Sequence, residues 1–306
     1  SNVVLNEMGT PSVAEAAAIL AGDHRGRLIQ NKQIYYSKEE ESGAVTIALA
    51  EVENPFAPHK GELHLIGSGP GDLKMLTSDS RQALTRCAVW IGYGPYLNYL
   101  ESIRGHDQVR IDSKLTFEKD RCQHALDLAK QGVKVGLISS GDSGIYGMAG
   151  LALDLWLNER LDSRPLFEVH PGISSFQMAA AKLGAPFMHD FCSISLSDLL
   201  TPWNQIEKRI KSAAIGDFVL AIFNPKSIKR DWQLKKTVDL LLECRNPSTP
   251  VAIARQLGRP EESIEIHTLE TLPFDRVDML TILVIGNSQS VIKNNKFLTP
   301  RGYFSN

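Results

Sequence analysis

The 306-residue sequence contains only four cysteines, and no two of them lie close together. Cys87, Cys122, Cys192 and Cys244 form no C-x-x-C pair, which is the spacing typical of zinc knuckles and redox sites. The disulfide framework of a secreted protein would need more cysteines at closer spacing. We therefore expect a cytoplasmic protein with neither a disulfide framework nor a metal site.

Long apolar runs and an excess of one charge are absent as well. No apolar run reaches the roughly 20 residues of a membrane-spanning helix, and the first ten residues lack the basic and apolar regions of a signal peptide. Lys and Arg number 33, Asp and Glu number 35, and the formal net charge is −2. Because nucleic acids bind to extended basic surfaces, we expect neither a nucleic acid nor a membrane as partner.

The chain is long enough for two domains, and its composition changes sharply within the first third. The stretch ENPFAPHKG contains Pro55 and Pro58, which cannot donate to a sheet and favour extended backbone around them. We expect a linker at 54–60 that follows a separate fragment at 1–53. This fragment carries one helical pattern, TPSVAEAAAIL, and two strand-like runs, which together make only a marginal core.

From Gly61 onward, short apolar runs alternate with amphipathic helical patterns. The runs ELHLI, VWIGY and VKVGLISS are typical of buried strands. This alternation predicts an α/β domain with a largely parallel sheet at 61–184. A second series at 190–303 ends in three candidate strands without a long helix between them, so we expect a mixed sheet there.

The motif GSGPGD directly follows the strand ELHLI. A dinucleotide-binding G-x-G-x-x-G motif would need glycine at the position of Asp72. In addition, Pro70 has no backbone N–H to donate to a pyrophosphate. The sequence therefore disfavours a nicotinamide dehydrogenase. The glycines suit a turn in which backbone N–H groups approach a ligand. Taken alone, a plain turn explains the motif equally well.

The motif SSGDSGIYGM follows the apolar run VKVGLI. Its glycines leave the backbone open at the carboxyl end of a strand, where open α/β sheets bind ligands. Asp142 offers a carboxylate to a hydroxyl or an amine, and Ile145 and Tyr146 offer an apolar wall. Alternatively, Asp142 caps the helix that follows.

The motif HPGISS leads into the helical pattern QMAAAKLG. Ser174 and Ser175 are natural helix caps, and their hydroxyls also stand where a ligand can reach them. We expect His170 and His189 to satisfy hydrogen bonds in loops or cores and not to catalyse.

Together, these motifs resemble the series found in the tetrapyrrole methylases, which use S-adenosylmethionine. GPGD, SSGDSGIYG, PGISS, SLSD, FNPKS, PVAIARQLG and MLTILVIGNS occur in this order across residues 61–303. GYGPYL, EKDRC and the final TPRGY are most similar to the branch that methylates C(17) of precorrin-3B, or its cobalt form, with ring contraction. Ser143 departs from the proline or alanine of many relatives. The resemblance implies two α/β domains of the tetrapyrrole methylase type with the cofactor cleft between them, plus a short N-terminal α/β fragment.

That fragment, residues 1–53, carries a resemblance of its own. NVVLNEMGTPSVAEAAAIL and AVTIALAEV are similar to the end of the C-terminal domain of CbiG, the cobalt-precorrin-5A hydrolase family. Most of that domain is missing, so we expect the remnant of a fusion.

The tetrapyrrole methylase resemblance implies which residues contact S-adenosylmethionine. Carried over by motif position, they are Pro70, Ser140, Gly141, Asp142, Ile145, Ser174, Ser175, Leu196, Phe223, Asn224, Ala252 and Leu257.

The implied substrate is a polycarboxylate macrocycle, which arginine and lysine side chains would anchor through charge-assisted hydrogen bonds. The candidates are Arg121, Lys226, Arg230 and Arg255, together with Lys229 and Arg259. We expect at least half of these six to be solvated bystanders.

Ring contraction also needs proton transfers, so an acid or base should face the macrocycle. Asp72 and Glu118 are the carboxylates within the motifs, although Glu118 also suits the first turn of a helix, where it favours the helix dipole. Tyr93, Tyr96 and His124 are further candidates.

Two other functions stay open. One is a methylase of the same architecture with a different acceptor, and the other is a non-catalytic protein that binds a corrinoid or the cofactor. We expect a homodimer whose partner is a small tetrapyrrole molecule.

Overall fold

The computed structural model describes residues 12–21, 27–36, 44–51, 60–227 and 230–303. The expected linker at 54–60 lies outside these ranges except for Lys60.

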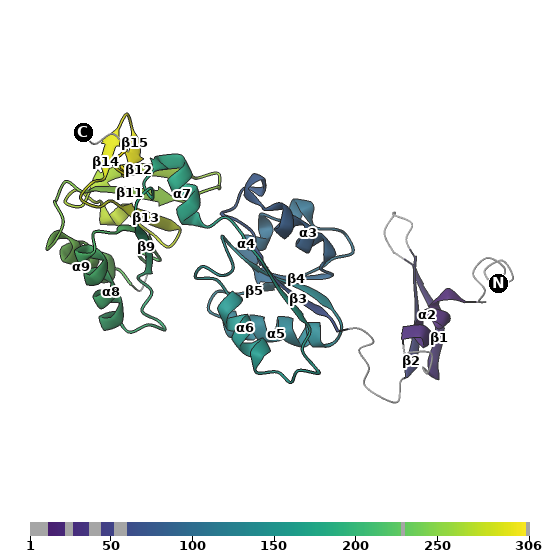
Figure 1. Ribbon diagram of the computed structural model, residues 1–306. Coiled ribbons are helices and arrows are strands. Elements are labelled where there is room, and N and C mark those ends of the chain that lie inside the picture. The colour runs from purple at the N-terminus through teal and green to yellow at the C-terminus, as the bar shows by residue number, and fades with distance from the viewer. Residues whose placement is uncertain (1–11, 22–26, 37–43, 52–59, 228–229, 304–306) are drawn as a thin grey trace.

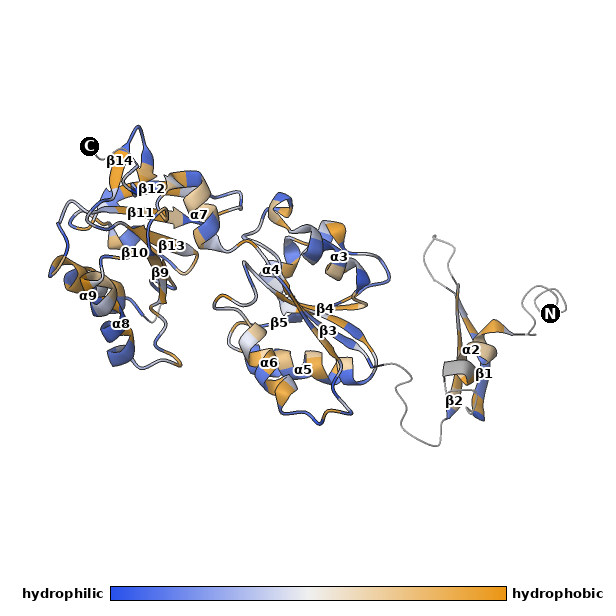
Figure 2. Ribbon diagram, viewed as in Figure 1, coloured by the Kyte–Doolittle hydropathy of each residue, from blue (hydrophilic) through white to orange (hydrophobic). Residues whose placement is uncertain are grey.

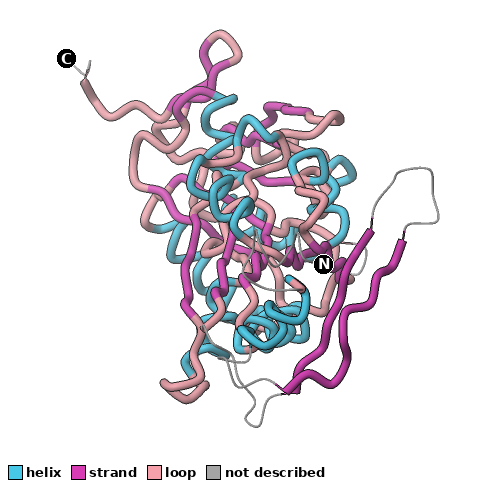
Figure 3. The backbone as a smooth tube through the Cα atoms, turned by 90° about the vertical axis from the view of Figure 1, so that its right-hand side faces the viewer, coloured by secondary structure: helices cyan, strands magenta, loops and turns pink. Residues whose placement is uncertain are grey.

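The N-terminal segment is a helix next to a two-stranded antiparallel hairpin, whose long strands run side by side in Figure 3. The elements are α2 (Val13–Ala21), β1 (Arg27–Tyr36) and β2 (Ala44–Glu51). The Glu15 carboxylate accepts the Lys32 N–H at 2.8 Å and ties α2 to β1. Tyr36 is 74% exposed and Leu49 is 46% exposed. One helix on one hairpin leaves these apolar side chains without cover, as expected of a domain fragment.

The first α/β domain is built on a five-stranded sheet in the order β5-β4-β6-β3-β7, and all its strands are parallel. The strands are β3 (Glu62–Gly67), β4 (Val89–Tyr93), β5 (Val109–Ser113), β6 (Lys134–Ser139) and β7 (Leu166–His170). The central strands β3 and β6 are buried almost throughout, because helices cover both faces of the sheet.

Two layers of helices cover this sheet, as Figure 1 shows. One face carries α3 (Ser78–Arg86) and α4 (Gly94–Asn98), with the 3-10 turns η1 (Leu73–Met75) and η2 (Glu101–Ile103) beside them; the other carries α5 (Glu118–Lys130) and α6 (Ala149–Leu157). Ile66 and Trp90 pack under the first layer, and Leu63 and Leu137 under the second.

Helix α6 begins at Ala149, later than the apolar pattern from Gly144 onward suggests. The Asp142 side chain accepts the Gly144 N–H at 2.8 Å, and Tyr146 has φ of 53°. Both features are incompatible with a regular helix, so this part of the motif forms a loop.

The second domain has a five-stranded sheet in the order β12-β11-β13-β10-β9, which is mixed as predicted. The strands are β9 (Phe191–Ser195), β10 (Val219–Phe223), β11 (Pro250–Arg255), β12 (Ser263–Thr268) and β13 (Thr281–Ile285). In Figure 2 the central strands are mainly hydrophobic. Three helices pack on the sheet, namely α7 (Ser175–Leu183), α8 (Trp203–Ile215) and α9 (Trp232–Leu242), and η3 (Phe274–Arg276) follows β12.

Helix α7 lies within the expected first domain at 61–184, but it packs on the second. Its Met178, Ala179 and Leu183 belong to one hydrophobic cluster with Val219 of β10 and Val284 of β13. A small sheet of β14 (Val291–Lys293), β15 (Lys296–Leu298) and β8 (Gly184–Ala185) continues from the end of α7. The two sheets with their helices confirm the predicted fold class of two α/β domains.

Among the described residues, no helix combines the length and apolar character that a membrane crossing requires.

Candidate functional site

A pocket lies between the two α/β domains, at the carboxyl ends of several strands. In the first domain, Pro70 follows β3, Asp142 follows β6 and Ser174 follows β7, and these three strands are neighbours in the sheet. In the second domain, Asn224 follows β10 and Leu257 follows β11. Parallel strands place the loops after them at one edge of a sheet, which explains why motifs far apart in sequence meet here.

Backbone hydrogen bonds join the loops of the first domain. The Gly141 N–H donates to the Gly69 carbonyl at 2.7 Å, and the Gly69 N–H donates back at 3.1 Å. The Asp142 carboxylate accepts the Gly144 N–H at 2.8 Å and the Gly172 N–H at 2.9 Å. Asp142 therefore closes its own loop and fastens it to the loop after β7.

The same loops pack backbone against backbone at three glycines. A Cβ atom at Gly67 would lie 2.6 Å from the Gly172 nitrogen, and one at Gly172 would lie 2.7 Å from the Gly67 carbonyl carbon and closer still to the Gly141 oxygen. Real Cβ atoms do not come that close to a backbone. The loops can meet only because Gly67 and Gly172 have no side chain.

Three pocket residues have a left-handed backbone although they are not glycine. Tyr146 has φ of 53°, and Asn224 and Gln256 each have φ of 49°. Such conformations cost free energy and cluster at functional sites. Tyr146 also reaches across to the second domain, where its ring lies 4.8 Å from that of Phe223 and its hydroxyl donates to the Ser193 carbonyl at 3.1 Å.

Arg259 lines another part of the pocket and stacks on two tyrosines. Its guanidinium carbon lies 5.8 Å from the Tyr96 ring centre and 5.3 Å from that of Tyr99. Within the described part of the chain, its buried Nε–H has no hydrogen-bond partner. Burial raises the pKa of the Tyr96 phenol and so favours its neutral form, which can donate a hydrogen bond. Arg259 and Tyr96 together suit a carboxylate or another oxygen-rich ligand.

Comparison with known proteins agrees with this architecture. The family model of the tetrapyrrole (corrin/porphyrin) methylases matches residues 62–273. The chain belongs to this family. A second model, described as the cobalamin synthesis G C-terminus, matches residues 1–50 and confirms the resemblance of the N-terminal fragment.

Individual relatives of this tetrapyrrole methylase are similar over most of the chain. The probable cobalt-factor III C(17)-methyltransferase of Salmonella typhimurium is 43% identical over 241 residues, which are 79% of this chain and 99% of the relative. The precorrin-3B C(17)-methyltransferase of Sinorhizobium sp is 38% identical over 254 residues, 79% of this chain and 97% of the relative. The crystal structure of the methyltransferase CobJ superposes with a TM-score of 0.75 at 32% identity and covers 78% of this chain and all of that one.

Most of the residues that the sequence assigned to the cofactor meet in this pocket. Those that line it are Pro70, Ser140, Gly141, Asp142, Ile145, Ser174, Ser175, Phe223, Asn224 and Leu257. Leu196 and Ala252 do not line it, because both are fully buried in hydrophobic clusters of the second domain. For these two residues, the assignment to the cofactor stays a prediction.

The four cations assigned to the substrate do not line the pocket, and each has a partner within the protein. Arg121 donates to the Ser113 hydroxyl and the Lys114 carbonyl, and Lys226 donates to the Phe274 carbonyl at 3.0 Å. The other two are equally engaged: Arg230 donates to the carbonyls of Leu196 and Asn224, and Arg255 pairs with Asp278 at 2.7 Å. Of the two further candidates, Arg259 lines the pocket and Lys229 lies outside the described residues.

Neither carboxylate assigned to acid–base chemistry lines the pocket. Asp72 caps η1 by accepting the Lys74 N–H at 2.9 Å, and its backbone lies beside Gly258, next to the pocket residues Pro70 and Leu257. Glu118 begins α5 and accepts the Thr116 N–H at 3.3 Å.

Several pocket residues were not assigned from the sequence. Tyr96 and Tyr146 line the pocket, although the sequence did not assign them to the cofactor. The other unassigned residues are Ala254, Gln256, Met279, Leu280, Thr281 and Ile282. Gln256 lies inside the motif PVAIARQLG, and Met279 begins the motif MLTILVIGNS. Both motifs were part of the resemblance, so a residue-by-residue assignment of these two runs would have found them.

Proposed function

We propose that this methylase transfers the methyl group of S-adenosylmethionine to C(17) of precorrin-3B or of cobalt-factor III, and that it contracts the macrocycle. The observation that carries the proposal is the pocket, where motif loops of both domains meet at the carboxyl ends of their strands. The relatives that are similar over nearly their whole length are named for C(17) methylation.

The pocket fits the proposed cofactor in its mixture of surfaces. Ile145, Leu257 and Ile282 provide apolar walls for an adenine ring, and Ser140 and Asn224 provide polar groups for a ribose or an amino acid. When bound, S-adenosylmethionine supplies a methyl group on a positively charged sulfur, which is readily attacked by a nucleophilic carbon.

The protein's contribution to such a transfer is positioning. The glycine loops let the backbone come close to the ligand, and the contact of Tyr146 with Phe223 narrows the space between the domains. Arg259 would hold a carboxylate of the macrocycle by charge-assisted hydrogen bonds, with Tyr96 as a neutral donor beside it. Holding the nucleophilic carbon in line with the methyl–sulfur bond, at near-contact distance from the methyl group, is what accelerates methyl transfer.

For ring contraction we propose Asp72 as the acid or base. Its position at the end of the GSGPGD turn places it next to the pocket wall formed by Pro70 and Leu257. Glu118 is the weaker candidate because it serves the start of α5.

Methyl transfer from labelled S-adenosylmethionine to two acceptors tests the assignment. We expect label in a precorrin-3B-type macrocycle and none in uroporphyrinogen III, which lacks the earlier modifications. Labelling of uroporphyrinogen III instead would show a methylase of the same fold with another acceptor.

Replacement of Asp142 by alanine should weaken the binding of S-adenosylmethionine. The variant loses the acceptor of the Gly144 and Gly172 N–H groups, so the loops that form the pocket separate. Losing a charge-assisted hydrogen bond costs about 1.5 to 3 kcal/mol, which corresponds to about a ten-fold to more than hundred-fold rise in Kd by calorimetry. Asp154→Ala removes the same charge from the exposed side of α6 and should leave Kd unchanged. An unchanged Kd in Asp142→Ala would remove this residue from the site.

A shortened chain that starts at Lys60 should keep both the cofactor affinity and the two-domain fold. The N-terminal hairpin and helix pack on one another, and their apolar side chains are largely exposed. Calorimetry and circular dichroism of the shortened and full chains provide the comparison. Loss of solubility or of binding would mean instead that the segment packs against the methylase domains.

The cytoplasmic location and the homodimer expected from the sequence belong to this proposal. Light scattering of the full chain measures the oligomeric state, and a monomeric mass would refute the homodimer.

A further inference from the structure

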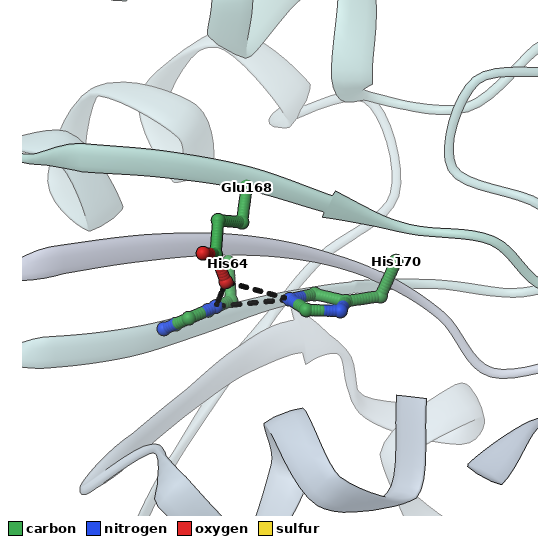
Figure 4. Close-up of side chains that lie close together, drawn as sticks. All are labelled: His64, Glu168 and His170. Carbon is green, nitrogen blue, oxygen red and sulfur yellow. Dashed lines mark hydrogen bonds and ion pairs between the residues drawn. The ribbon is translucent and has the colours of Figure 1, made fainter. Parts of the chain in front are cut away.

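Two buried histidines and a glutamate converge on one point outside the pocket. His64 lies in β3, and Glu168 and His170 lie in the neighbouring strand β7, with His64 directly opposite Glu168. Figure 4 shows the two rings and the carboxylate turned toward one another. The His64 Nδ1 atom lies 2.9 Å from the His170 Nε2 atom, and a Glu168 carboxylate oxygen lies 3.3 Å from the first and 3.6 Å from the second.

The outer nitrogens of both rings face further carboxylates. The His64 Nε2 atom lies 2.8 Å from Glu62, and the His170 Nδ1 atom lies 2.7 Å from Asp79 of α3. A carboxylate accepts hydrogen bonds, so each outer nitrogen carries the proton and donates it. The inner nitrogens then present two lone pairs to each other and to the Glu168 carboxylate. Such an arrangement is repulsive unless a shared proton or a metal cation lies between these atoms.

The distances match those between the ligands of a tetrahedral metal ion. Ligand atoms at about 2.0 to 2.1 Å from zinc lie about 3.3 Å from one another. The three measured separations, 2.9, 3.3 and 3.6 Å, lie on both sides of this value. In metal sites, the second nitrogen of a ligating histidine donates to a carboxylate, as both histidines do here.

We propose that His64, Glu168 and His170 bind a divalent transition-metal ion, for which Zn²⁺ has the best-fitting geometry. Two imidazoles and one carboxylate form a typical zinc ligand set with a fourth position for water. The Glu168 side chain is 40% exposed, which gives the ion a path from solvent.

The side chains around the cluster carry an excess of negative charge, which favours the binding of a divalent cation. Three carboxylates surround it, those of Glu62, Asp79 and Glu168. Lys134 pairs with Glu62 at 2.7 Å, and Arg86 lies 3.6 Å from Glu168. Negative charge therefore remains in excess over these two cations near the cluster.

The ion would stabilise the loop that forms one wall of the methylase pocket. His170 is followed directly by Pro171 and Gly172, and Gly172 donates to Asp142 in the pocket. Thr77, which caps α3, donates to the Pro171 carbonyl at 3.0 Å. A metal ion would thus join β3, β7 and, through Asp79, helix α3 at the base of this loop. None of the three ligands lines the pocket, so the role is structural.

Zinc binding to the untagged full chain tests the proposal without any methylation assay. After removal of metal by a chelator and dialysis, titration with Zn²⁺ followed by elemental analysis should give one ion per chain. The bound ion should raise the melting temperature, because it binds only the folded state. Replacement of Zn²⁺ by Co²⁺ should give the strong visible absorption of a tetrahedral site.

Variants locate the ion. His170→Ala and Glu168→Gln should abolish stoichiometric binding, and Asp79→Asn, on the exposed surface of α3, should weaken it by about 10- to 100-fold while the fold persists. His267→Ala is the matched control, because His267 and Glu265 form a pair at 3.1 Å without a second imidazole. It should bind zinc like the unaltered chain.

Two results would overturn the proposal. One is the absence of stoichiometric zinc in the folded full chain, which would mean that the two rings share a proton. The other is a zinc affinity that is unchanged in both single variants, Asp79→Asn and Glu168→Gln, which would place the ion elsewhere.

Discussion

Replacement of Asp72 by asparagine should lower turnover by about 100- to 10,000-fold while the affinity for S-adenosylmethionine stays the same. General acid–base catalysis contributes about this much, and an amide cannot exchange the proton that ring contraction requires. The change should leave the fold intact, because asparagine also caps helices and its oxygen can still accept the Lys74 N–H. Steady-state kinetics and calorimetry measure the two effects separately.

Glu118→Gln is the control for this experiment. Its carboxylate accepts the Thr116 N–H at the start of α5, so we expect a small effect on stability and little effect on turnover. Methylated but uncontracted product from Asp72→Asn would separate the two chemical steps. Full turnover in both variants would contradict the assignment and direct attention to Tyr96, the phenol that lines the pocket.

Replacement of Gly172 by alanine should both destabilise the first domain and impair cofactor binding. The added Cβ would lie 2.7 Å from the Gly67 carbonyl carbon, so two backbone segments would have to move apart. Overpacking of this kind costs about 1 to 3 kcal/mol, and each kcal/mol lowers Tm by about 2 to 4 °C in a protein of 150 to 250 residues. Because the Gly172 N–H also donates to Asp142, Kd for the cofactor should rise by at least about ten-fold.

Gly150 provides the matched control for this substitution. It lies in α6, and a Cβ there would meet nothing within 4 Å. Gly150→Ala should therefore leave Kd unchanged and keep or raise Tm, since alanine is the better helix former by about 1 kcal/mol. Equal behaviour of the two variants would show that the close approach of the loops does not matter for binding.

The sequence predicted the parts of the fold whose hydrophobic pattern is strong and local. The buried strands β3, β6, β10 and β13 are nearly continuous apolar runs, and α5, α8 and α9 have clear apolar faces. Strands β5 and β7 escaped prediction because both lie at edges of their sheet and carry polar residues. Strand β7 has no continuous apolar run because Glu168 and His170 point toward His64 at positions where apolar residues would be expected.

The pocket between the domains was largely predictable because many of its lining residues belong to short glycine and serine motifs at strand ends. A motif does not reveal which of its side chains face the core: Leu196 and Ala252 belong to motifs of the resemblance, and their side chains lie in hydrophobic clusters. The cations assigned to the substrate have partners within the protein that the sequence did not reveal. Whether an arginine is free depends on partners far along the chain, such as Asp278 for Arg255, and no local pattern reveals them.

Analysis of the reaction product tests the central claim most directly. The full chain would be incubated with S-adenosylmethionine labelled with ¹³C in its methyl group and with precorrin-3B or cobalt-factor III, and the product examined by mass spectrometry and ¹³C NMR. We predict a gain of one labelled methyl group, attached at C(17) of a contracted ring. Absence of label, or a labelled methyl group on another carbon, would contradict the account.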